Sequence, residues 1–138
     1  MEHISVENLE VIGRGKCGNV YTLSEDKVIK TFRSFVPAEA VEREQRNARH
    51  VYDMGIPSPN VYEIVSTEDG LGLIYEKVAA PSLEKMMREE PSRLKEYSIS
   101  LGKLGRHVHS IDSRGVGFIS AKEEFLNRLA LSRRSVRF

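Results

Sequence analysis

The chain has 138 residues, about the size of one ordinary domain. Hydrophobic residues make up 40% of it and charged residues 30%, which is the usual mixture of a folded globular protein and excludes a low-complexity or collagen-like chain. A formal net charge of +1 provides no strong field for a nucleic-acid backbone or an anionic membrane, so neither is expected as a partner.

The chain contains one cysteine, Cys17, which can form no internal disulfide and no cysteine-based zinc site. Such cysteine usage is typical of a reducing compartment, and we expect the protein to be cytoplasmic. The N-terminal residues Met-Glu-His-Ile-Ser contain no apolar run, and no stretch of about 18 apolar residues follows. The sequence therefore predicts neither a signal peptide nor a membrane-spanning segment.

The first third of the chain has the pattern of β-strands. Two β-prone stretches flank glycines at positions 13, 15 and 18, which permit a tight reversal, so we predict a hairpin over residues 9–23. Residues 27–32 (Lys-Val-Ile-Lys-Thr-Phe) form a third predicted strand, after the turn-forming sequence Ser-Glu-Asp. Because these connections are too short for a crossover helix, the three strands are predicted to be antiparallel.

A helix is predicted from Ala38 to Met54, because Pro37 suits its first turn and the glycine and prolines of residues 55–59 end it. Two further strands are predicted over residues 60–66 and 71–78, joined by the turn Thr-Glu-Asp-Gly. One face of the helix is an inward stripe that includes a carboxylate; its members are Val41, Glu44, Ala48, Val51 and Tyr52. Residues 9–78 thus contain five predicted strands and one helix.

The remainder of the chain has helical patterns. Ser82 is expected to cap a short helix that ends at Glu89, and a long amphipathic helix follows Pro91. A short helix over residues 121–131 and a solvated basic tail over residues 132–138 complete the chain. The apolar stripe of the long helix consists of Leu94, Tyr97, Leu101, Leu104, Val108 and Ile111. This stripe needs a partner surface, which the rest of the chain barely supplies.

Gly13, Gly15 and Gly18 form a G-x-G-x-x-G motif. Two phosphate-binding architectures use this motif: a helix follows the last glycine in the dinucleotide-binding fold, and a strand follows it in a kinase-type loop. Residues 19–23 (Asn-Val-Tyr-Thr-Leu) have the pattern of a strand, which favours the kinase-type loop, whereas helical structure over residues 19–29 would favour dinucleotide binding. An ordinary bulged turn also accommodates the three glycines.

Lys30 follows Val-Ile, the context of the kinase lysine that neutralises phosphate oxygens from a rigid strand. Glu44 lies on the packed face of the predicted helix, where a carboxylate is unfavourable unless a cation meets it. We therefore predict a contact between Lys30 and Glu44. Taken singly, Lys30 also fits an exposed strand end and Glu44 a solvated helix face of the kind on which Glu42 can pair with Arg46.

With this order of glycine loop, strand lysine and helix glutamate, followed by Gly-Ile-Pro-Ser-Pro at 55–59 and Leu-Ile-Tyr-Glu at 73–76, the chain resembles the aminoglycoside phosphotransferase and choline kinase family. The resemblance covers most of residues 9–111. It implies an α+β, protein-kinase-like fold, with a nucleotide-binding N-lobe over residues 1–78 and part of a helical C-lobe over residues 79–138. It also implies ATP as the nucleotide, with the Glu76 carbonyl and the Val78 N–H pairing with the adenine edge.

The chain departs from the family pattern after the long helix. The chemistry of the family needs a catalytic loop with a base and an asparagine, and then a metal-binding aspartate. Asp112 is the last aspartate of the sequence, and His-Ser-Ile-Asp over residues 109–112 has the wrong spacing for that loop. We therefore assign no catalytic or metal-binding residue and expect a truncated or split kinase, in which Mg²⁺ binds only if a partner chain supplies its ligands.

A second hypothesis is a non-catalytic, kinase-like interaction module that binds another chain, or a second copy of itself, through the long helix. His107 and His109 do not argue for a metal site, because side chains two residues apart on a helix diverge, and we expect both to be structural. The phosphate acceptor stays open between aminoglycoside, choline, homoserine and protein hydroxyl groups.

Overall fold

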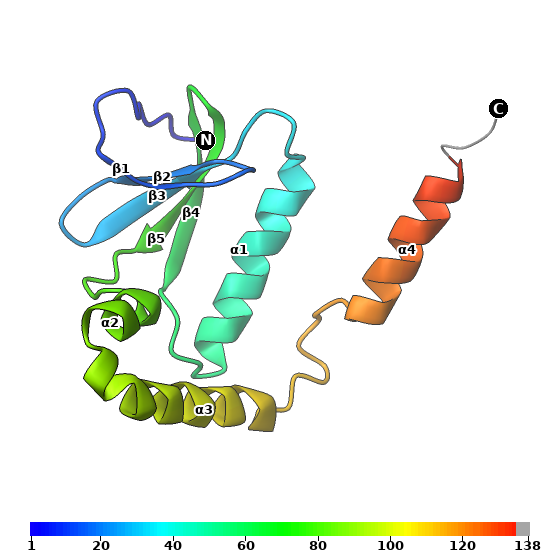
Figure 1. The fold of residues 1–138 in the computed structure, drawn as a ribbon. Coiled ribbons are helices and arrows are strands. Elements are labelled where there is room, and N and C mark those ends of the chain that lie inside the picture. The colour runs from blue at the N-terminus through cyan, green and yellow to red at the C-terminus, as the bar shows by residue number, and fades with distance from the viewer. Residues whose placement is uncertain (135–138) are drawn as a thin grey trace.

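The computed structural model describes residues 1–134, and their side chains as far as Leu129 with the exception of Arg128. A five-stranded antiparallel sheet, with strand order β1-β2-β3-β5-β4, forms the first part of the molecule (Figure 1). The strands are β1 (Val11–Arg14), β2 (Asn19–Thr22), β3 (Lys27–Thr31), β4 (Val61–Thr67) and β5 (Gly70–Glu76). The helices are α1 (Ala38–Asp53), α2 (Leu83–Glu89), α3 (Leu94–Ser110) and α4 (Ala121–Arg134), with a 3-10 turn η1 (Pro91–Arg93) before α3.

The predicted α+β class and the five antiparallel strands are confirmed, and two boundaries are corrected. The last strand was expected to reach Val78 but ends at Glu76, because the N–H of Lys77 instead donates to the carbonyl of Asp26 in the β2–β3 turn, at a donor–acceptor distance of 2.8 Å. The last helix was expected to end at residue 131 but continues to Arg134, because no glycine or proline interrupts it. The rest of the predicted basic tail, residues 135–138, lies outside the described residues.

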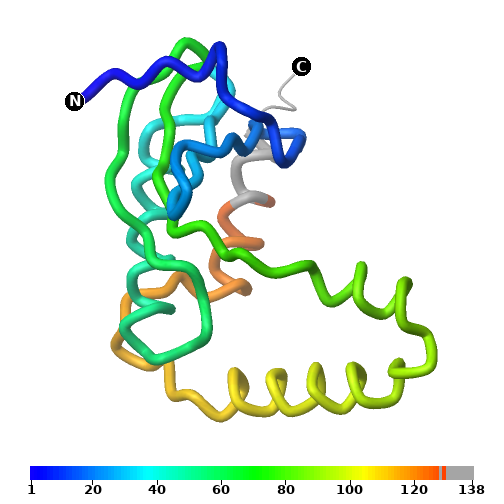
Figure 2. The backbone as a smooth tube through the Cα atoms, turned by 90° about the vertical axis from the view of Figure 1, so that its left-hand side faces the viewer, coloured from blue at the N-terminus to red at the C-terminus, as the bar shows by residue number. Residues whose placement is uncertain are grey.

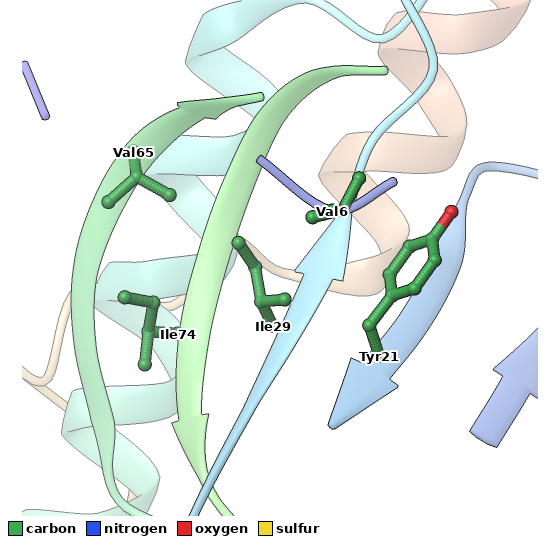
Figure 3. Close-up of a cluster of buried hydrophobic side chains, with 5 residues drawn as sticks. All are labelled: Val6, Tyr21, Ile29, Val65 and Ile74. Atoms are coloured by element: carbon green, nitrogen blue, oxygen red, sulfur yellow. The ribbon is translucent and has the colours of Figure 1, made fainter. Parts of the chain in front are cut away.

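Apolar residues are buried on both faces of the sheet, since side chains alternate between the faces along each strand. One cluster consists of Val6, Tyr21, Ile29, Val65 and Ile74, and Figure 3 shows it with α1 behind the strands. The other cluster consists of Phe32, Val41, Val61 and Leu73, and it includes the residue that α1 buries completely, Val41. Helix α1 therefore covers one face, and the N-terminal segment covers part of the other.

The N-terminal segment is an addition that the sequence patterns did not predict. The N–H of Ile4 donates to the carbonyl of Ser66, and the N–H of Ser66 donates to the carbonyl of Glu2, with distances of 2.9 Å in both cases. These bonds attach the segment in parallel to the end of the edge strand β4. The Glu68 carboxylate also accepts a bond from the N–H of Val6.

The helices after the sheet bury little of their apolar surface. In Figures 1 and 2, α3 runs past the lower end of α1 instead of lying along the sheet. Tyr97 is buried, but the rest of the predicted stripe is mostly exposed, from 36% for Val108 to 52% for Leu101. None of the helices in the described part of the chain is long and apolar enough to cross a membrane.

Candidate functional site

Lys30 and Glu44 are brought together by the alternation of side chains on β3. Lys30 is paired in register with Leu73 of β5, whose side chain lies in the cluster under α1, so Lys30 projects from the same face. Its Nζ donates to Oε1 of Glu44 at 2.5 Å, which confirms the predicted contact. About one-third of each side chain is exposed, 34% and 35%, so the pair is only partly desolvated.

Tyr75 completes this contact from β5. Its hydroxyl donates to the same Glu44 oxygen at 2.8 Å. Burial raises the pKa of Tyr75 well above its ordinary value, and the Glu44 carboxylate raises it further, so the phenol stays protonated and acts as a donor. Sequence reasoning missed Tyr75; the signal was its position two residues after Leu73, which places both side chains on the face of the sheet that α1 covers.

An aromatic ring also supports the ammonium group of Lys30. Nζ lies 4.8 Å from the centroid of the Phe32 ring, and Phe32 is itself buried. The carboxylate of Glu44 and the face of the ring together fix the ammonium near the end of β3. This arrangement favours a lysine that is held in place over one that moves freely in solvent.

A cavity of about 550 Å³ adjoins this pair, in the size range of small-molecule sites. Cys17 contributes to its wall from the β1–β2 loop, and Lys30 and Phe32 contribute from β3 and its end. Its other walls are formed by Val36, Ala40, Arg43, Glu44, Asn47, Ala48 and Val51. Two cationic side chains and one carboxylate line the cavity, so its charge suits an anionic group. Tyr52, which was expected on the inward stripe of α1, is 45% exposed, and it is the second-last residue of that helix.

The β1–β2 loop contains the three predicted glycines. The N–H of Gly15 donates to the carbonyl of Gly18 at 2.8 Å, which closes a two-residue turn at Lys16 and Cys17. Strands, not a helix, follow at residues 19–22 and 27–31, and this excludes the dinucleotide-binding alternative. A register irregularity between Val11 and Gly13 indicates a bulge in β1, just before the loop, as an ordinary bulged hairpin would also have.

Only one of the three glycines is required by the fold. A Cβ atom at Gly18 would lie 1.7 Å from the carbonyl oxygen of Thr31, so no other residue fits there without backbone movement. At Gly13 and Gly15 an added Cβ would meet its nearest atoms at 3.5 Å and 3.4 Å, which are ordinary contacts. Packing therefore explains Gly18, whereas Gly13 and Gly15 leave the loop backbone open to close approach from outside.

A sequence model of the phosphotransferase enzyme family matches residues 9–137. The chain belongs to this family. No match was found among the curated proteins. The fold of this phosphotransferase-family protein, its glycine loop and its Lys30–Glu44 pair agree with the resemblance inferred from the sequence.

The two remaining predicted site residues lie apart from the cavity. Glu76 is the last residue of β5 and pairs in register with Lys27, and its side chain accepts a bond from the N–H of Asn60 at 2.9 Å. Val78 lies beyond the end of β5 and is 62% exposed. Neither is among the residues that line the cavity at Lys30.

Asp112 is paired locally in this phosphotransferase-family protein. Its carboxylate accepts bonds from Nε and Nη2 of Arg114, with distances between 2.8 and 3.1 Å, and this guanidinium lowers the pKa of Asp112. In the part of the chain that the structure describes, no three His, Cys, Asp or Glu side chains are placed to bind a metal ion. The described residues therefore do not fit a Mg²⁺ site.

Proposed function

We propose that this phosphotransferase-family chain binds ATP through its sheet region, as the nucleotide-binding part of a small-molecule phosphotransferase. The observation that carries the proposal is the Lys30 ammonium, which Glu44 holds beside a cavity that Cys17 of the glycine loop also lines. A fixed ammonium and open backbone N–H groups are what phosphate oxygens require. Tyr75 supports the pair by donating to Glu44.

The proposal assigns roles to the other predicted residues. Gly13 and Gly15 allow the loop backbone to approach the phosphates, and Gly18 seats the loop against β3. The carbonyl of Glu76 and the N–H of Val78 bind the adenine edge at the end of β5. In domain terms, residues 1–78 form the nucleotide-binding lobe and residues 79–138 contribute to a second, helical lobe. The exposed, unpaired thiol of Cys17 fits a reducing compartment, and we place the protein in the cytoplasm on that ground.

The transfer step itself needs groups that the described residues do not offer. A base for the acceptor hydroxyl and ligands for Mg²⁺ are therefore assigned to another segment or to a second polypeptide. Such an addition would also cover α3, whose exposed residues include Leu94, Leu101, Leu104 and Val108. According to the proposal, this chain binds the nucleotide by itself, and phosphoryl transfer requires the additional segment or polypeptide.

Calorimetric titration with ATP tests the binding proposal. The wild-type chain should bind ATP, and Lys30→Met should weaken binding by about tenfold or more, because a charged hydrogen bond to phosphate is lost. Lys27→Met is the matched control: Lys27 lies on the same strand, but its ammonium sits over the ring of Tyr62, 5.0 Å from the centroid. Equal affinity of wild type and Lys30→Met, with both folded, would contradict the proposal.

A non-catalytic interaction module is the second candidate, and the exposed face of α3 favours it. In this alternative, the face binds another chain or a second copy of this one, and no nucleotide is needed. Sedimentation velocity distinguishes self-association: the wild type should form concentration-dependent dimers that Leu101→Glu abolishes. A monomer at high concentration would remove the self-associating form of this candidate.

A further inference from the structure

A ring of hydrogen bonds lies on the sheet face opposite Lys30, at the base of the glycine loop. Asn19 directly follows Gly18, and its backbone N–H donates to Oγ1 of Thr31 at 3.4 Å. The Thr31 hydroxyl donates to Oδ2 of Asp69 at 3.1 Å. Asn19 also donates through its side chain to the hydroxyl of Tyr21 at 3.3 Å, and Tyr21 donates to the same Asp69 oxygen at 3.0 Å.

Both hydroxyl groups of the ring donate to one carboxylate, that of Asp69. The backbone and the side chain of Asn19 begin two short chains of bonds, through Thr31 and through Tyr21, and both end at Asp69. A carboxylate can only accept, so it fixes the direction in which both hydroxyls donate. Hydrogen bonds to an ionised acceptor are stronger than neutral ones. Asp69 therefore has the chemistry needed to set the position of Asn19.

The parts joined by the ring are themselves held in place. Thr31 and Tyr21 are buried, at 1% and 8% exposure. Asp69 lies in the turn between β4 and β5, where Gly70 has φ +134° and a Cβ would lie 2.5 Å from the carbonyl oxygen of Phe32. The turn that carries Asp69 thus packs directly on the chain that follows β3.

We propose that Asp69 is a positioning residue for the glycine loop. It holds the loop from behind, through Asn19, so that Cys17 of the loop stays at the wall of the cavity at Lys30. The expected effect of Asp69 on ATP affinity rests on the proposed ATP-binding function. The hydrogen bonds that connect Asp69 to Asn19 do not require a nucleotide. A second cavity, of about 580 Å³ and lined in part by Gly18, Asn19, Thr31 and Asp69, marks the side from which the ring is reached.

Amide hydrogen exchange of the full chain without nucleotide tests the coupling. In Asp69→Ala and in Tyr21→Phe, exchange at Gly15 and Asn19 should be about fivefold faster or more, which corresponds to the loss of one net hydrogen bond. Glu68→Ala is the matched control, because Glu68 lies in the same turn but binds the N–H of Val6. Unchanged exchange in Asp69→Ala, or the same increase in the control, would overturn the inference.

Nucleotide titration then separates positioning from general destabilisation. In Asp69→Ala, ATP affinity should fall about fivefold and adenosine affinity should be unchanged, since the loop would contact only phosphates. An equal loss for both ligands would overturn the positioning role. If the wild type binds neither ligand, the proposed function fails and the role of Asp69 toward nucleotide fails with it, while the exchange result still shows whether Asp69 holds the loop.

Discussion

Residues 1–78 and residues 79–134 bury their apolar side chains to very different extents. In the sheet region, Ile29, Val41, Val65 and Leu73 are completely buried, because α1 and the N-terminal segment cover the two faces. In the helical region, Leu101 and Leu104 of α3 stay 52% and 43% exposed. In the α3–α4 loop, the ring of Phe118 lies edge-on against that of His50 in the last turn of α1, with 5.8 Å between the ring centroids.

The comparison shows that a strong sequence pattern is not enough to form a core. The stripe on α3 has the regular spacing of a buried helix face, but packing requires a second surface. The sheet region supplies its own second surfaces within a short stretch of chain. The proposed ATP site accordingly lies in the sheet region, whose apolar core is buried. The surface proposed for assembly lies on α3 in the helical region, where most of the apolar stripe stays exposed.

The largest contrast is expected for core leucines. Leu73→Ala should lower the free energy of unfolding by about 2–5 kcal/mol, because it leaves a cavity in a closed cluster. Leu101→Ala should change it by no more than about 0.5 kcal/mol in the isolated chain. Urea denaturation followed by circular dichroism measures both. Similar decreases in the free energy of unfolding for both variants would show that this face of α3 is packed in solution and would contradict the contrast between the two regions.

Glycine substitutions should differ in sign between the two regions. Gly18→Ala should destabilise the chain by about 1–3 kcal/mol or more, because the methyl group would overlap the carbonyl of Thr31. Gly102→Ala should stabilise α3 by about 0.5–1 kcal/mol, since nothing lies within 4 Å of the added Cβ and alanine favours helix. Thermal unfolding of the two variants is the measurement. Loss of stability in Gly102→Ala would indicate that this side of α3 is covered.

Ion pairs provide a finer contrast. Glu44→Gln should lower the free energy of unfolding by about 1 kcal/mol, because Lys30 and Tyr75 both donate to this partly buried carboxylate. Glu84 of α2 pairs with Arg88 at the exposed surface, and Glu84→Gln should have an effect below about 0.5 kcal/mol. Urea denaturation at low and moderate salt compares the two. Equal changes in the free energy of unfolding for the two variants would mean that the Glu44 carboxylate is no more desolvated than that of Glu84 on the surface of α2.

The smallest expected effect is a pH dependence from Glu68. Hydrogen bonds from Ser5 and from the N–H of Val6 lower the pKa of Glu68 from 4.5 to about 2. A carboxyl whose pKa is lowered by folding stabilises the folded state above its unfolded pKa, so this contribution is present above pH 4.5 and is lost as the pH falls toward 2. Acid titration of wild type and Glu68→Gln should show the slope in the wild type only. A wild-type slope retained in the variant would contradict this assignment.

Several features could be predicted from local patterns. The strands, α1 and the N-cap of α2 follow from β-branched runs, proline placement and Ser82, whose hydroxyl accepts from the N–H of Lys85. The contact between Lys30 and Glu44 could be predicted because a carboxylate on a packed helix face needs a cation and few candidates precede it. Each of these inferences uses residues close in sequence or a single chemical requirement.

Other features depend on register and on long-range approach. Tyr75 meets Glu44 across 31 positions and Asp69 meets Tyr21 across 48, and no local pattern encodes such distances. The attachment of the N-terminal segment to β4 spans more than 60 positions, and nothing in its short sequence marks it as part of the sheet. The exposure of Tyr52 likewise depends on how much of α1 the sheet covers.

The sequence by itself determined the class of fold, the family resemblance and the identity of the central ion pair, because these depend on periodicity, motif order and charge. Only the tertiary structure decided which glycine is required by packing, which tyrosine donates to Glu44 and which aspartate accepts hydrogen bonds from Thr31 and Tyr21. The physical reason is that these roles arise where separate strands and turns come within hydrogen-bond distance, and that distance is fixed by the register of the sheet.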